Sequence, residues 1–100
     1  MEPLSSKQKK YLKSKANHLK PVIQIGKSGV NQQIISSIIV ALSQHELIKV
    51  KFIAFKEDKE QFLDAIVTET DSQFVSLIGH VLTLYKEAEE PEKREFDLPA

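Results

Sequence analysis

The sequence predicts one α/β domain, in which three helices alternate with the four strands of a mixed sheet. Apolar residues recur at helical spacing in three segments, and four other segments are β-branched or alternate between apolar and polar residues. Helices that alternate with strands require at least one right-handed crossover, and hence a partly parallel sheet. A chain of 100 residues has the length of one domain and can bury one core without disulfide bonds, which this chain cannot form because it contains no cysteine. The predicted order is helix, strand, helix, strand, helix, strand, strand.

The first helix is predicted to begin at Ser5. Ser5 and Gln8 have the spacing of a capping box, in which each side chain satisfies a free backbone N–H. Pro21 should end this helix near Asn17, because the residue before a proline avoids helical geometry. The apolar stripe of the helix is Leu12, Ala16 and Leu19. A β-branched run at residues 22–25 then predicts a short strand.

The second helix and the strand after it carry the clearest patterns. Asn31 is placed to cap a helix that runs to about His45. Its apolar stripe is Ile34, Ile35, Ile38, Ile39 and Leu42. Residues 47–53 read as a strand, since apolar residues alternate there with lysines at positions 49 and 51.

The last three elements are a helix and a hairpin. The third helix follows a charged segment, and its stripe is Phe62, Leu63, Ile66 and Val67. Residues 74–78 and 81–85 read as two strands joined by Gly79 and His80. Glycine in the first central position suits a type II′ turn, so this pair should add an antiparallel edge.

Charge is distributed unevenly along a chain whose formal net charge is zero. Residues 1–51 contain nine lysines and two acids, a net of +7, and residues 52–100 contain five bases and twelve acids, a net of −7. Such asymmetry points to a polyanionic partner or an acidic tail. Residues 87–100 carry six of the acids and two prolines, and we expect a flexible tail there, although Phe96 and Leu98 could dock on the domain.

The segment most informative about function is the GxxG loop, formed by Gly26, Lys27, Ser28 and Gly29. It lies between a predicted strand and a predicted helix. Two glycines would let the backbone take positive φ and approach a ligand, and the helix start offers free N–H groups to an anion. GxxG loops of this layout clamp nucleic-acid backbones. A tight turn with glycine used for geometry alone is the competing interpretation.

A second feature is the excess of lysine near the N-terminus. The lysines that could extend a phosphate-binding surface around Lys27 are Lys9, Lys10, Lys13 and Lys20, provided that the first helix packs near the GxxG loop. A solvated helix face is the alternative. Lys49 and Lys51 could join the same surface or could line an exposed edge strand, where lysine discourages aggregation.

Other kinds of chemistry find little support in the sequence. The three histidines fit no zinc-binding spacing, and no group of residues combines a nucleophile, a base and an electrophile, so we expect neither a metal, a cofactor nor catalysis. The N-terminus lacks the apolar stretch of a signal peptide, and the longest apolar run, residues 38–42, is too short to span a bilayer. We therefore expect a cytoplasmic protein with no membrane partner.

Several motifs together resemble the YhbY family, whose domain is also called the CRM domain. The matching segments are residues 4–13, 16–22, 25–29, 45–51, 65–67, 69–70, 78–80 and 84–85. The resemblance spans roughly residues 4–86, which is nearly the whole of the domain expected at residues 1–86, and it does not include the acidic tail at residues 87–100. It implies a four-stranded mixed sheet with three helices, similar to the C-terminal domain of a bacterial translation initiation factor. It also implies RNA binding through the GxxG loop and nearby basic residues.

The hypothesis is therefore a monomeric, non-enzymatic RNA-binding protein that associates with precursors of the large ribosomal subunit. The ribosomal association comes from the family resemblance. The alternative is a module that docks on ribosomal or other proteins through its helices or its acidic tail. The residues alone do not separate RNA from DNA, because phosphate contacts carry no information about the sugar.

Overall fold

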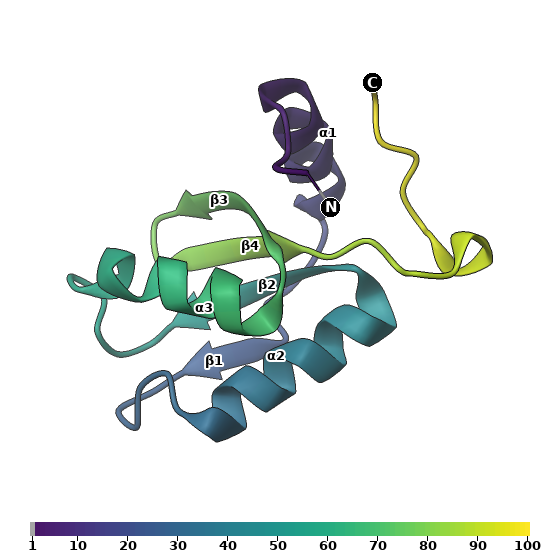
Figure 1. The fold of residues 1–100 in the computed structure, drawn as a ribbon. Coiled ribbons are helices and arrows are strands. Elements are labelled where there is room, and N and C mark those ends of the chain that lie inside the picture. The colour runs from purple at the N-terminus through teal and green to yellow at the C-terminus, as the bar shows by residue number, and fades with distance from the viewer. Residues whose placement is uncertain (1) are drawn as a thin grey trace.

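The computed structural model describes residues 2–100 and has the predicted order of elements (Figure 1). The helices and strands are α1 (Ser6–Ala16), β1 (Ile23–Ile25), α2 (Gln32–His45), β2 (Leu47–Phe52), α3 (Leu63–Thr70), β3 (Gln73–Ile78) and β4 (Val81–Tyr85). Short 3-10 turns, η1 (Lys59–Phe62) and η2 (Pro91–Lys93), precede α3 and follow β4. The Ser5–Gln8 capping box and the Asn31 cap are both present.

The four strands form one mixed sheet in the order β1-β2-β4-β3. Strands β1 and β2 are parallel, joined through α2, whereas β4 pairs antiparallel with both β2 and β3. Gly79 has a φ of +60°, and Ile78 pairs with Val81, as the predicted hairpin turn requires. The hairpin thus supplies the edge strand β3, and it also places β4 in the interior of the sheet beside β2.

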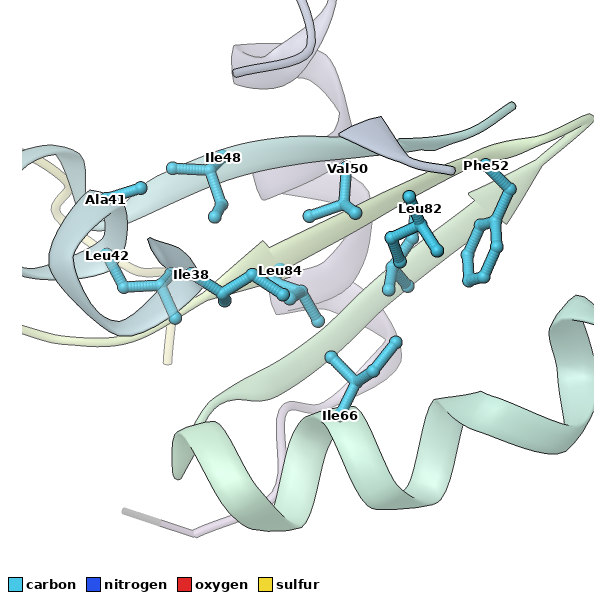
Figure 2. Packing of buried hydrophobic residues seen from close by; sticks show 10 residues of the cluster. Ile38, Ala41, Leu42, Ile48, Val50, Phe52, Ile66, Leu82 and Leu84 are labelled. Carbon is cyan, nitrogen blue, oxygen red and sulfur yellow. The ribbon is translucent and has the colours of Figure 1, made fainter. Parts of the chain in front are cut away.

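The main core lies between the sheet and the pair α2 and α3. In Figure 2, Ile66 of α3 points toward the sheet residues Leu82 and Leu84. Alternation along β2 sends Ile48, Val50 and Phe52 into this core, as predicted (Figure 2). Burying such side chains contributes roughly 1.5–3 kcal/mol each.

Two predicted core positions are wrong. Leu19 lies beyond the end of α1 and is 38% exposed, because the helix already ends at Ala16. Ile39 of α2 is 41% exposed, whereas Ala41, which the predicted stripe omitted, is buried beside Leu42. The stripe of α2 is narrower than its run of isoleucines suggested, since only one arc of this helix faces the sheet.

A smaller core lies on the opposite face of the sheet, under α1 (Figure 1). Leu12 and Ala16 of α1 pack there against Leu47 of β2, Val75 of β3 and Tyr85 of β4. Tyr85 is fully buried, and its hydroxyl has no hydrogen-bond partner among residues 2–100. Burial raises the pKa of this phenol, and the nearby charge of Glu46 raises it further, so the group is uncharged at neutral pH.

Glu46, between α2 and β2, is a buried carboxylate that holds the C-terminal segment. It is only 3% exposed and has a positive φ of 58°. Its side chain accepts hydrogen bonds from the backbone N–H groups of Ala88 at 2.6 Å and Glu95 at 2.5 Å, and its carbonyl accepts one from Lys86 at 2.8 Å. Residues 86–95 therefore form a loop closed on one residue, Glu46.

Beyond this loop, the last residues return to α1. Phe96 packs edge-on against Tyr85 with ring centroids 6.3 Å apart, and Leu98 joins the same cluster. The side-chain amide of Gln8 donates to the carbonyl of Pro99 at 3.0 Å. The docking considered for Phe96 and Leu98 is thus present in the structure. No helix within residues 2–100 is both long and apolar enough to cross a membrane.

Replacing Glu46 by alanine removes the acceptor of two backbone N–H groups without changing the backbone preference at this position. We expect the Glu46→Ala variant to lose about 1–3 kcal/mol of unfolding free energy, measured by urea denaturation, because an unpaired polar group costs that much. Residues 87–100 should also become more sensitive to protease. Glu69→Ala, on the exposed side of α3, is the control; equal behaviour of the two variants would contradict the role of Glu46.

Candidate nucleic-acid interface

The GxxG loop is a tight turn between β1 and α2. The backbone N–H of Gly29 donates to the carbonyl of Gly26 at 2.9 Å, which closes the turn. Lys27 and Ser28 occupy its two central positions and are exposed. Ile25, the last residue of β1, is fully buried, so the strand anchors the loop. The turn therefore presents Lys27 to solvent from a rigid base.

The two glycines of the loop have different roles. Gly29 has a φ of +73°, a conformation that favours glycine, and is buried. Gly26 does not lie in the left-handed region, and a Cβ there would meet only Ile53 Cδ1 at 3.8 Å. The expectation that both glycines take positive φ is therefore wrong for Gly26. Only Gly29 needs to be glycine for the shape of the turn.

The start of α2 adds a partial positive charge beside the loop. The Asn31 side chain accepts a hydrogen bond from the N–H of Ile34 at 2.9 Å, which satisfies one of the free donors at this end. The first turn of α2 contains no acidic residue. The positive end of the helix dipole is thus not offset by a carboxylate from that turn, and an anion near Gly29 would be stabilised.

The segment after β2 also borders the loop, a contact that no local pattern of residues indicates. The N–H groups of Ile53 and Ala54 both donate to the carbonyl of Ile25, at 3.0 and 3.1 Å. The ring of Phe55 lies beside Gly29, with Cε2 3.5 Å from the place where a Cβ would stand. This contact follows from the parallel pairing of Ile25 with Phe52, which no local pattern specifies.

The predicted lysines on and after α1 lie at a different end of the sheet from the loop. Lys10, Lys13 and Lys20 are exposed, whereas Lys9 is half-buried with its Nζ 5.5 Å from the centroid of the Phe74 ring. Helix α1 packs near Leu47, at the start of β2, and the GxxG loop follows Ile25, which is opposite Phe52 at the end of β2. Five residue steps along a strand span roughly 17 Å. The structure therefore does not bring these lysines against the loop.

Lys49 and Lys51 lie between these two places. Strand β2 has β1 on one side and β4 on the other, so the edge-strand interpretation of these lysines is wrong. Both alternate with the core residues of β2 and share the face that α1 covers only near Leu47. Their neighbours on that face, from the strand register, are Gln24, Ser76, Ile78, Val81 and Thr83.

We call these seven residues the open sheet face. Gln24, Lys51 and Ile78 are exposed on it, Lys49 and Val81 are half-buried, and Ser76 and Thr83 are buried. The open sheet face contains two lysines and no acid. Ile78 is 64% exposed, and a shallow hollow is lined by Pro21, Lys49, Ile78, Val81 and Thr83. Lys51 pairs with Gln24, next to Ile25, so the open sheet face reaches toward the GxxG loop. It lies between the two groups of predicted site residues, and none of its seven residues is acidic.

Comparisons with known proteins bear on this arrangement. The family model of the CRS1 / YhbY (CRM) domain matches residues 4–86.

The chain belongs to the CRS1/YhbY (CRM) domain family.

This CRM domain is 44% identical over 97 residues to "Probable RNA-binding protein YqeI" of Bacillus subtilis, covering 96% of this chain and 99% of that protein. It is 46% identical over 91 residues to a protein of Haemophilus influenzae named "RNA-binding protein", covering 90% and 92% of the two chains. The solution structure of SAV1595 from Staphylococcus aureus superposes with a TM-score of 0.81 at 37% identity, covering 96% and 99%. The predicted family and fold are thereby confirmed.

Acidic residues of the CRM domain lie on several elements. Glu57 and Asp58 follow Phe55, whose ring borders Gly29, and the N–H of Asp58 donates to the carbonyl of Phe55 at 3.1 Å. Asp64 and Glu69 belong to α3, on the face of the sheet opposite α1. Phe96 and Leu98 of the C-terminal segment pack on the α1 side, where Glu95 lines the same cavity as Lys20. Residues 86–90 instead line a cavity with Ile39 and Leu42 of α2. Within residues 2–100, no three histidine or carboxylate side chains gather where they could hold a metal ion.

The contrast between the two glycines can be tested by paired substitutions. Gly29→Ala should lower the free energy of unfolding by about 1–2 kcal/mol, because an L-residue is strained at positive φ. Gly26→Ala should leave it unchanged or slightly raised, since the added methyl group meets no close neighbour. Urea denaturation of both variants measures the difference, and equal losses would show that the turn geometry is not as described.

Proposed function

We propose that this CRM domain binds RNA through its sugar–phosphate backbone and acts, without catalysis, on precursors of the large ribosomal subunit. The observation that carries the proposal is the open sheet face, which contains two lysines and no acid and lies between the GxxG loop and the lysines near α1. The names of the relatives from Bacillus subtilis and Haemophilus influenzae support RNA as the ligand. The ribosomal step rests on the family resemblance.

In this proposal each part of the surface has a distinct role. Lys27 neutralises one phosphate at the tip of the loop, where the closed turn and the start of α2 supply further positive potential. Lys51 and Lys49 bind the phosphates that follow across the open sheet face. The lysines beyond this face, Lys9, Lys10, Lys13 and Lys20, continue the surface toward α1.

Binding of this kind is led by charge and shape. Lysine to phosphate contacts position a nucleic acid and carry no sequence information by themselves. They release counterions, so the affinity should fall steeply as salt rises. The proposed ligand is RNA, and a DNA strand of the same length is the natural competitor in any binding experiment.

A protein-docking function is the second candidate, and one feature favours it. Helix α2 leaves Ile39 and Val40 exposed at 41% and 54%, and it contains no lysine, arginine, aspartate or glutamate. Such a face could contact a ribosomal protein while the opposite face of the sheet holds RNA. The acidic C-terminal segment is a weaker docking element, because Glu46, Tyr85 and α1 already hold it.

The lysines can be ranked by the salt dependence of binding. Lys27→Ala should reduce the slope of log affinity against log salt by about 1, and the double variant Lys49→Gln/Lys51→Gln by about 2, because each lost phosphate contact removes one counterion release. Filter binding of a labelled oligoribonucleotide between 50 and 300 mM salt gives the slopes. Lys93→Ala is the control, since this lysine pairs with Glu90 in the C-terminal segment; slopes equal to this control would exclude both sites.

The ribosomal role can be tested in cells. Ultraviolet crosslinking of the tagged protein, followed by sequencing of the attached RNA, should enrich precursor sequences of the large ribosomal RNA. The Lys27→Ala/Lys49→Gln/Lys51→Gln variant is the matched control and should recover much less RNA. If the native protein and this variant recover the same small amount of RNA while both co-purify with ribosomal proteins, the protein-docking function replaces the proposed one.

A further inference from the structure

Phe55 is a large aromatic side chain in an unfavourable backbone conformation next to the GxxG loop. It has a φ of 55°, which is rare for a residue with a bulky side chain. Its side chain does not gain full burial in return, because Phe55 remains 38% exposed. Phe52, three positions earlier, is fully buried. Backbone strain at an exposed aromatic residue indicates a function for that position.

The neighbours of Phe55 fix its ring beside the loop. Cε2 and Cζ of the ring lie 3.5 and 3.7 Å from the place of a Cβ on Gly29. Phe62, the last residue of η1, packs against the Phe55 ring in an edge-to-face arrangement with ring centroids 5.5 Å apart. Phe62 is itself packed on the main core. The exposed ring is therefore held by the core at one side and borders the proposed phosphate-binding turn at the other.

We propose that Phe55 stacks on a base of single-stranded RNA whose phosphate is held by the GxxG loop. This inference rests on the proposed function and adds to it the class of RNA that is bound. A base lies within one nucleotide of its phosphate, and aromatic side chains bind unpaired bases by stacking. In a duplex the faces of each base are covered by its neighbours, so duplex RNA could reach the lysines but not this ring.

Substitution at position 55 can be made without adding strain. Asparagine accepts positive φ more readily than phenylalanine does, so Phe55→Asn removes the ring and relieves the backbone. Phe55→Tyr keeps a ring of the same size. We expect Phe55→Asn to weaken binding of a twelve-residue oligoadenylate by about 5- to 150-fold, the range found for loss of one stacked base. Phe55→Tyr should bind within about twofold of the native protein by the same reasoning.

Inorganic polyphosphate is the matched ligand, because it carries the charges and no bases. Its affinity should be the same for the native protein and for Phe55→Asn. Equal weakening toward polyphosphate and oligoadenylate would mean that Phe55 only shapes the loop, and it would overturn the inference. The native protein should also prefer the single strand over a duplex of equal length, and Phe55→Asn should lose this preference.

Tryptophan fluorescence can report on stacking directly. The chain contains no tryptophan, so a single tryptophan introduced at position 55 would be the only one in the protein. The tryptophan fluorescence of a Phe55→Trp variant should be quenched by oligoadenylate and not by polyphosphate. Phe96→Trp is the control. Phe96 lies in the C-terminal segment and packs on Tyr85 of β4, so the fluorescence of a tryptophan there should not change. If oligoadenylate binds but does not quench the tryptophan at position 55, the stacking inference is overturned and the proposed function is not. A native protein that binds no RNA of any form would overturn the proposed function and the inference together.

Discussion

Strand β2 is the element through which the other parts of the domain are connected. It pairs with β1 on one side and with β4 on the other, so all four strands depend on its position. Its alternate side chains form part of both cores, with Ile48, Val50 and Phe52 facing α2 and α3 and Leu47 facing α1. Period-two alternation makes a register shift of one residue unacceptable, because it would turn Lys49 and Lys51 into the core.

The two ends of β2 also position the proposed binding loop and the C-terminal segment. At its carboxyl end, the parallel pairing with β1 brings residues 53–55 against the GxxG loop. At its amino end, Glu46 turns the chain out of α2 and binds the C-terminal segment. Between them, the lysines of β2 lie on the half of the sheet that α1 leaves open. One strand thus determines the spacing between the loop, the open sheet face and α1.

The zero net charge is a sum over surfaces of opposite sign. The acids of α3 lie across the sheet from α1, as a protein that holds a polyanion on one face requires. The end of the C-terminal segment departs from this division, because Phe96 and Leu98 pack on the α1 side and Glu95 lines a cavity with Lys20. Its position is set by Glu46 and the Tyr85–Phe96 contact, not by charge complementarity with the lysines alone.

Many features that depend on neighbours along the chain could be predicted from the residues, although the exposure of Leu19 and Ile39 and the backbone of Gly26 could not. The capping box at Ser5, the Asn31 cap, the alternation in β2 and the hairpin at Gly79 are local, and the structure confirms each of them. The family could also be predicted from the sequence, since the matching motifs lie in order along residues 4–86. Three other relations are visible only in the folded chain: which strands are interior, how far α1 lies from the GxxG loop, and that Phe55 borders Gly29. The buried role of Glu46 belongs with these, because its partners are more than 40 residues away. Such relations arise from pairing between distant segments, and no local spacing of residues encodes them.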